Sequence, residues 1–63
     1  MMDYVAFDKD NGVAAEVYQT GARDWRIVLK DTDADLAVSV LNIKDTDFRV
    51  VKERADFLVG FQN

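Results

Sequence analysis

The 63-residue chain contains no cysteine, no histidine and no proline. Without cysteine and histidine it has no disulfide, no zinc site of the usual ligand types and no Ser–His or Cys–His nucleophile pair. Its three glycines, Gly12, Gly21 and Gly60, stand apart from one another, so a glycine-rich phosphate-binding loop is absent as well. The serine and threonine hydroxyl groups could act as nucleophiles only with a neighbouring base, and the only bases near them are carboxylates in solvated turns. We therefore predict a protein that is not an enzyme and binds no cofactor.

Long apolar segments are also missing. No run approaches the roughly 18 residues that span a bilayer, and the opening MMDYVAFDKDNG lacks the basic start and apolar stretch of a signal peptide. These features predict a cytoplasmic protein without membrane contact. The length predicts one domain over residues 1–63. With 49% hydrophobic residues, including four Phe, two Tyr and one Trp, the chain has enough apolar surface to fold.

Positive charge is scarce, and the negative excess is concentrated in one segment. The formal net charge is −4, and the tetrapeptide Lys-Asp-Thr-Asp occurs at residues 30–33 and again at 44–47. Residues 31–47 hold five aspartates and one lysine, whereas elsewhere seven acidic residues balance seven basic ones. Because nucleic-acid binding usually requires a basic face, we predict no direct contact with nucleic acid.

Four short runs rich in β-branched and aromatic residues predict strands separated by turns. The dipeptide Asn11-Gly12 predicts a tight hairpin turn in which both residues have positive φ. The last run, LAVSVLNI, is apolar on both faces, so we expect either a strand with a neighbour on each side or the best-covered element of the fold; a helix is the second option there. The predicted strands are residues 4–7, 13–19, 25–30 and 36–43.

After the second tetrapeptide the apolar period becomes that of a helix. Thr46 or Asp47 is the expected N-cap and Gly60 the stop signal. The alternative for residues 48–61 is a further hairpin, because valine and phenylalanine also favour strands. The apolar arc of the predicted helix comprises Phe48, Val50, Val51, Ala55, Phe57, Leu58, Val59 and Phe61.

The predicted fold is therefore α+β, a small four-stranded antiparallel β-meander with one C-terminal amphipathic helix packed on one face. Alternate turns of a meander lie at the same end of the sheet, so the turns at 8–12 and 31–35 should lie together. This arrangement predicts an acidic rim made of Asp8, Asp10, Asp31, Asp33 and Asp35.

Three interpretations of the rim compete. Aspartates are good turn residues, and surface charge maintains solubility. The spacing Asp31-x-Asp33-x-Asp35 also resembles the start of a calcium loop, but Leu36 and Asn42 stand where such a loop requires glycine and glutamate, so we predict no metal site. In the third interpretation the carboxylates imitate nucleic-acid phosphates and bind a protein with a basic surface.

The sequence thus favours a small, non-enzymatic protein-binding module that blocks a basic, nucleic-acid-handling protein. In size, charge and lack of catalytic residues it is similar to small acidic inhibitors encoded by bacteriophages, including anti-CRISPR proteins. Tyr18, Tyr4 and Trp25 are of the residue types enriched in protein interfaces, and Tyr18 is the predicted anchor if it faces solvent. The alternative is that all three belong to the core. The alternative is a structural protein that self-associates into a homodimer or larger homo-oligomer, without nucleic-acid mimicry.

Overall fold

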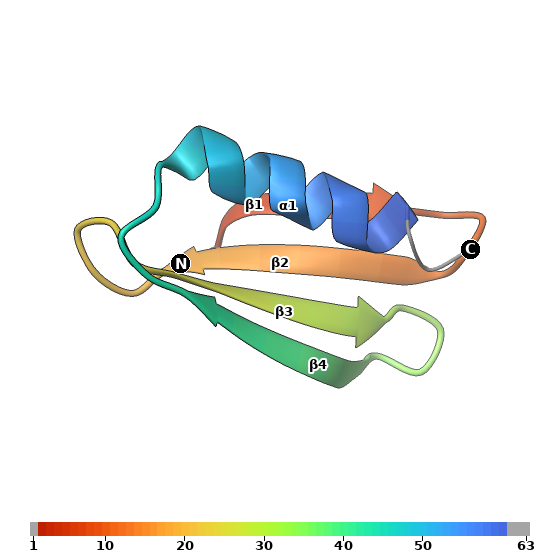
Figure 1. Ribbon diagram of the computed structural model, residues 1–63. Coiled ribbons are helices and arrows are strands. Elements are labelled where there is room, and N and C mark those ends of the chain that lie inside the picture. Colours follow the sequence, from red (N-terminus) through yellow and green to blue (C-terminus); the bar gives the residue numbers. More distant parts are fainter. Residues whose placement is uncertain (1, 61–63) are drawn as a thin grey trace.

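The chain forms four consecutive antiparallel strands followed by one helix in a computed structural model that describes residues 2–60 (Figure 1). The strands lie in the order β1-β2-β3-β4, so β1 and β4 are the two edges of the sheet, and the helix lies on one face. The predicted α+β meander is confirmed, and the hairpin alternative for the C-terminal segment is wrong. The elements are β1 (Met2–Asp8), β2 (Val13–Gln19), β3 (Trp25–Asp31), β4 (Leu36–Ile43) and α1 (Phe48–Gly60).

Alternate side chains of each strand point to opposite faces of the sheet, and the strand register groups them into rows. Val17 lies opposite Ile27, which lies opposite Leu41, and this row faces the helix. The other side of the sheet, here called the open face, has no element packed on it among the described residues (Figure 1). A central row of the open face comprises Val5, Glu16, Val28 and Val40.

The helix is anchored over β1 and β2. Val51, Ala55 and Val59, each one turn after the last, are its buried residues. They share the core with Ala6 and Ala15, a cross-strand pair whose small side chains let the helix approach the sheet closely. A helix about 10 Å wide cannot cover four strands spaced about 4.8 Å apart. It therefore contacts β1 and β2 extensively, β3 only slightly, and leaves β4 outside.

The apolar arc predicted for the helix is wrong at two positions. Val50 is 50% exposed and Phe57 is 59% exposed, because only a narrow stripe of the helix meets the sheet. Phe48 and Leu58 do pack against the core, as predicted. Phe61, also assigned to the arc, lies outside the described residues.

The expectation that residues 36–43 form either a strand with a neighbour on each side or the best-covered element of the fold is also wrong. β4 is an edge strand, and the exposed fractions of Leu36, Val38 and Val40 are 62%, 65% and 54%. Only Leu41 and Ile43 of this strand pack partly against the core. The apolar character of β4 on both faces is not matched by any covering element within residues 2–60.

The first hairpin turn differs from the tight turn predicted for Asn11-Gly12. Of these two residues, only Gly12 has a positive φ, at 64°. The loop between β1 and β2 spans four residues, 9–12. It is held by the Asp8 carboxylate, which accepts hydrogen bonds from the backbone N–H groups of Asp10 (3.0 Å) and Asn11 (3.3 Å) and from the Asn11 side-chain amide (2.7 Å). Such an Asx turn lets the side chain of the last strand residue set the path of the loop.

The turn between β3 and β4 repeats this construction. The Asp31 carboxylate accepts hydrogen bonds from the N–H groups of Asp33 (3.0 Å) and Ala34 (3.3 Å), and Asp35 closes the loop with φ 55° where the first turn has Gly12. Asp35 tolerates this left-handed conformation better than most residues because its short polar side chain can bond locally. The two turns are thus structural equivalents although their sequences differ.

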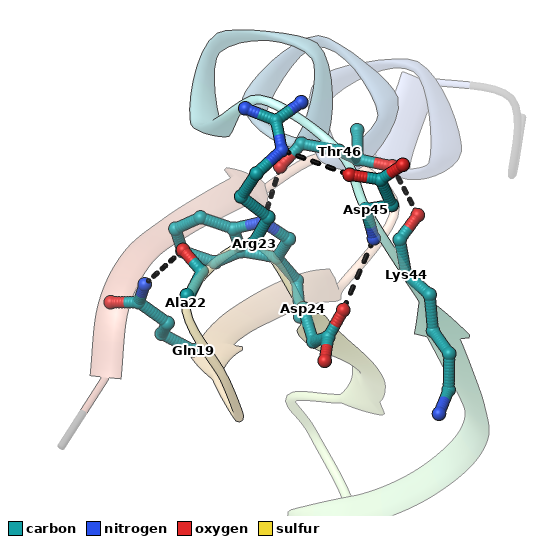
Figure 2. A network of polar contacts seen from close by, with 8 residues as sticks. Gln19, Ala22, Arg23, Asp24, Lys44, Asp45 and Thr46 are labelled. Atoms are coloured by element: carbon teal, nitrogen blue, oxygen red, sulfur yellow. Dashed lines mark hydrogen bonds and ion pairs between the residues drawn. The ribbon is translucent and has the colours of Figure 1, made fainter.

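The second Lys-Asp-Thr-Asp copy does not form such a turn but joins the start of the helix to the β2–β3 turn (Figure 2). The Thr46 N–H donates to the Arg23 carbonyl (2.8 Å), and the Trp25 indole N–H donates to the Thr46 carbonyl (2.8 Å). Arg23 pairs with Asp45 at 3.0 Å, and the Asp45 N–H donates to the Asp24 carboxylate at 3.1 Å. This network, here called the clasp, fixes where the helix begins.

Asp47 occupies the N-cap position, one of the two predicted. Its carbonyl accepts the first helical hydrogen bonds, from the N–H groups of Val50 (3.0 Å) and Val51 (3.1 Å). The next residue, Phe48, stacks on Trp25 with ring centroids 5.1 Å apart. Stacking and the clasp together hold the first turn of α1 against β3.

Replacing Gly12 by alanine should destabilise the protein. An alanine at this position would have to keep the unfavourable φ of 64°, and its Cβ atom would lie 3.2 Å from Asp33 Oδ2. We expect a loss of about 1–2 kcal/mol in the free energy of unfolding, measured by urea denaturation. Gly60→Ala is the control, because Gly60 is not in the left-handed region and, within residues 2–60, a Cβ atom there would meet no atom within 4 Å apart from its chain neighbours and the adjacent helix backbone. Equal stability of Gly12→Ala and the wild type would contradict the assigned turn conformation.

Candidate functional site

The structure brings the two acidic turns together at one end of the sheet, as the meander topology predicts. The Thr32 N–H donates to the Gly12 carbonyl at 2.9 Å, which extends the β2–β3 ladder into both loops. A Cβ atom on Gly12 would come within 3.2 Å of the Asp33 carboxylate, so Asp33 reaches over the neighbouring turn. The rim, meaning Asp8, Asp10, Asp31, Asp33 and Asp35, is therefore one continuous surface.

The five rim carboxylates are not equivalent. Asp8 and Asp31 are half-buried and accept the backbone hydrogen bonds that build their own turns. Asp10 and Asp33 are exposed, and within residues 2–60 their carboxylates form no hydrogen bond or ion pair. The negative charge available to a partner is therefore carried chiefly by Asp10 and Asp33.

Asp35 links the rim to the open face through a chain of polar contacts. Its carboxylate lies 3.0 Å from Lys30 Nζ, and Lys30 Nζ lies 3.8 Å from Glu16 Oε2. The Tyr18 hydroxyl donates a hydrogen bond to Glu16 Oε1 at 2.7 Å. The hydrogen bond to Asp35 raises the pKa of Lys30, and the hydrogen bond to Glu16 raises the pKa of Tyr18. The structure thus connects the predicted anchor with the rim.

Tyr18 is half-buried on the open face, whereas the side chains of the other two candidates, Tyr4 and Trp25, pack on the helix side of the sheet. Trp25 is buried in the core and bonded to Thr46. Tyr4 packs against the core, and its hydroxyl donates to Asp56 Oδ1 at 2.7 Å. Of the three, only Tyr18 lies on a face that no other element of residues 2–60 covers.

An apolar patch on the open face was missed from the sequence. Phe7 is 58% exposed and Val5 is 45% exposed; the two lie on the same face of β1. Phe7 pairs with Ala14 and lies one residue before the rim at Asp8. The sequence could have predicted this patch, because side chains alternate along a strand. If Tyr4 and Ala6 face the helix, then Val5 and Phe7 must face the opposite side of the sheet.

The end of the sheet opposite the rim carries an open hollow. An open cavity of about 270 Å³ lies at the clasp end, where β3 begins and β4 ends, and Thr20, Asp24, Arg26 and Lys44 are among its lining residues. Within residues 2–60 no group of three acidic side chains is placed to hold a metal ion.

Over residues 2–60, α1 is too short and too polar to traverse a lipid bilayer.

Comparisons of this chain with protein-family models, with curated proteins and with solved structures found no match. The geometry of the rim and the open face is consequently the basis on which a function can be inferred.

The turn-building and the exposed aspartates should differ in their effect on stability. Asp8→Ala or Asp31→Ala removes the acceptor of two backbone hydrogen bonds, so each should lower the free energy of unfolding by about 1 kcal/mol. Asp10→Asn and Asp33→Asn should change it by less than about 0.5 kcal/mol. Urea denaturation of the four variants measures both effects. A larger loss for Asp33→Asn than for Asp31→Ala would show that these roles are assigned wrongly.

The two tyrosines should ionise at higher pH in the folded than in the unfolded chain. Hydrogen bonds to Asp56 and Glu16 raise the pKa of Tyr4 and Tyr18 above the ordinary value of about 10. Groups with a raised folded pKa stabilise the fold below their unfolded pKa, and this contribution disappears as pH rises through the folded pKa. Stability should therefore fall in alkali, and Tyr4→Phe and Tyr18→Phe should each make that fall shallower.

Ultraviolet titration of tyrosinate in the native protein and in urea measures the two pKa values directly, because the chain has only these two tyrosines. The single phenylalanine variants assign each transition. A native midpoint at or below the midpoint in urea would contradict the hydrogen-bonded arrangement.

Proposed function

We propose that this protein is a small, non-enzymatic protein-binding module whose acidic rim binds a basic, nucleic-acid-handling protein. The observation that carries the proposal is the junction of the two acidic turns, which places Asp10 and Asp33 on one surface without partners inside residues 2–60. Carboxylates that the fold does not use remain available for cationic side chains of another protein.

Charge complementarity is the main source of recognition in this proposal. A cluster of carboxylates creates a negative potential that attracts lysine and arginine side chains, including those that normally contact phosphates. Such binding accelerates encounter and weakens as salt screens the charges. Asp8, Asp31 and Asp35 add to this potential even though their oxygens already accept bonds from their own turn or from Lys30.

Apolar contact beside the rim would supply the affinity that exposed charges alone lack. Phe7 adjoins Asp8, and Leu36 adjoins Asp35, so both ends of the rim border exposed apolar side chains. Tyr18 lies further along the open face and connects to the rim through Glu16 and Lys30. A partly apolar patch bordered by polar residues is typical of a protein-binding surface.

A cytoplasmic inhibitor is the function that we infer from these features. By occupying the basic groove of a nucleic-acid-handling protein, the rim would exclude that protein's substrate, as in the small acidic inhibitors of bacteriophages, anti-CRISPR proteins included. Inhibition of this kind requires no catalytic group in the chain, in agreement with its lack of cysteine and histidine.

The decisive experiment is affinity capture of partners from a bacterial lysate by the tagged protein, followed by direct binding of each purified partner. We expect a basic nucleic-acid-binding protein whose affinity falls at least about tenfold between low and high salt. The double variant Asp10→Asn/Asp33→Asn should bind more weakly at low salt, because it removes two rim charges while leaving the turns intact. The nucleic acid should compete with the wild type for the same partner.

Glu53→Gln is the matched control for the single variant Asp33→Asn. Glu53 is an exposed acidic residue of α1 that has no hydrogen bond or ion pair within residues 2–60, and it lies away from the rim. Both changes remove one negative charge, so a general effect of net charge would weaken binding equally. Equal weakening, or an affinity that does not respond to salt, would refute the rim as the binding surface.

A further inference from the structure

β4 combines three properties that seldom occur together in an isolated edge strand. It is eight residues long, it contains no charged residue and no proline, and most of it is exposed. Proteins usually protect free edges with charges, prolines or covering elements, because unpaired backbone groups there recruit further strands. The opposite edge is better protected, since β1 carries Asp3 and Asp8 and lies beneath α1 (Figure 1).

We propose that β4 pairs antiparallel with β4 of a second copy of this chain, forming a two-fold symmetric dimer with one continuous sheet. This interface lies at the sheet edge and goes beyond the rim interaction proposed above. An isologous antiparallel pair satisfies the free edges of both copies at once. No other edge within residues 2–60 offers an uncharged strand of this length.

The register of this pairing follows from the faces of β4. In a continuous sheet, residues directly opposite one another must point to the same face. β4 contains a bulge: Leu29 pairs with Ser39 and Lys30 with Ala37, which leaves Val38 as the extra residue. Counting the remaining positions, the middle residue of the strand is Val40, on the open face.

A two-fold axis at Val40 therefore places this side chain opposite its own copy and matches the faces of all other pairs. The facing residues are then Ser39 with Leu41, Ala37 with Asn42, and Leu36 with Ile43. The two residues of each pair lie on the same face of the sheet, and because β4 contains no charged residue, no like charges face each other along the strand.

The charges that flank β4 fit the same register. Asp35 precedes the strand and Lys44 follows it, so antiparallel pairing brings Asp35 of each copy next to Lys44 of the other. Lys44 forms no ion pair within residues 2–60, so it is available for this contact. The two acidic rims lie at opposite ends of such a dimer, whereas parallel pairing would bring them side by side. Charge complementarity thus selects a second copy in the antiparallel direction.

The mass of the protein in solution tests the proposal. Sedimentation equilibrium of the wild type over a range of concentrations should give the mass of two chains, and the dimer should persist in high salt because backbone bonds and apolar contacts hold it. Val40→Lys places two ammonium groups opposite each other and should raise the dissociation constant by at least about tenfold. Val50→Lys is the control, because Val50 is exposed to a similar degree but lies on the helix.

Cross-linking tests the register itself. The chain has no native cysteine, so Val40→Cys introduces a single thiol that should form an intermolecular disulfide under mild oxidation. Residues opposite each other in an antiparallel pair have Cα atoms about 4.5–5.5 Å apart, within the range that a disulfide bridges. Val50→Cys should cross-link far more slowly.

A wild type that stays at the mass of one chain at all concentrations would overturn the proposal and leave the edge to a strand from another protein. A dimer that Val40→Lys leaves intact would also overturn it. These outcomes can be distinguished from failure of the rim proposal. The double variant Asp10→Asn/Asp33→Asn should weaken partner binding without changing the mass in solution. Val40→Lys should change the mass, and it lies on the opposite edge of the sheet from the first acidic turn.

Discussion

Most features of this small protein depend on the docking of one helix onto one half of a four-stranded sheet. Val51, Ala55 and Val59 pack against the Ala6–Ala15 pair, and the clasp around Trp25 and Thr46 fixes where the helix begins. A single helix is too narrow to cover four strands. Burial is consequently concentrated over β1, β2 and part of β3. The open face and β4 are left for other contacts.

The aspartates divide into structural and available groups, and the division is set by backbone geometry. Asp8 and Asp31 end their strands and accept the N–H groups of the following loop, so their charge also contributes to the fold. Asp10 and Asp33 lie two residues later, where no backbone donor of residues 2–60 is directed at them. The five aspartates of the rim are therefore not equivalent, since the carboxylates of two of them are engaged in building the turns and those of two others are left without a hydrogen bond or ion pair inside residues 2–60.

The rim interaction and the β4 pairing would use different physical forces, and the two surfaces meet at Asp35, which directly precedes β4. Recognition through the rim, as proposed, would be electrostatic and would weaken with salt, whereas the proposed strand pairing would depend on backbone hydrogen bonds and apolar contact that salt affects little. Antiparallel pairing at β4 would engage Asp35 but leave Asp10 and Asp33 of both copies free at opposite ends, so one dimer could present two equivalent acidic surfaces. Neither interaction needs a catalytic residue, in keeping with the composition of the chain.

Local sequence determined the elements: runs of β-branched and aromatic residues predicted the strands, and the 3.6-residue period predicted α1. Turn residues between the strands predicted the meander that places the two acidic turns together. Tertiary packing decided what local patterns do not encode. Apolar β4 is exposed because the helix docks elsewhere, and Val50 and Phe57 are exposed because the contact stripe is narrow. The repeated tetrapeptide makes the same point. One copy builds an Asx turn and the other a clasp, because a side chain bonds to whichever donors the fold brings within reach.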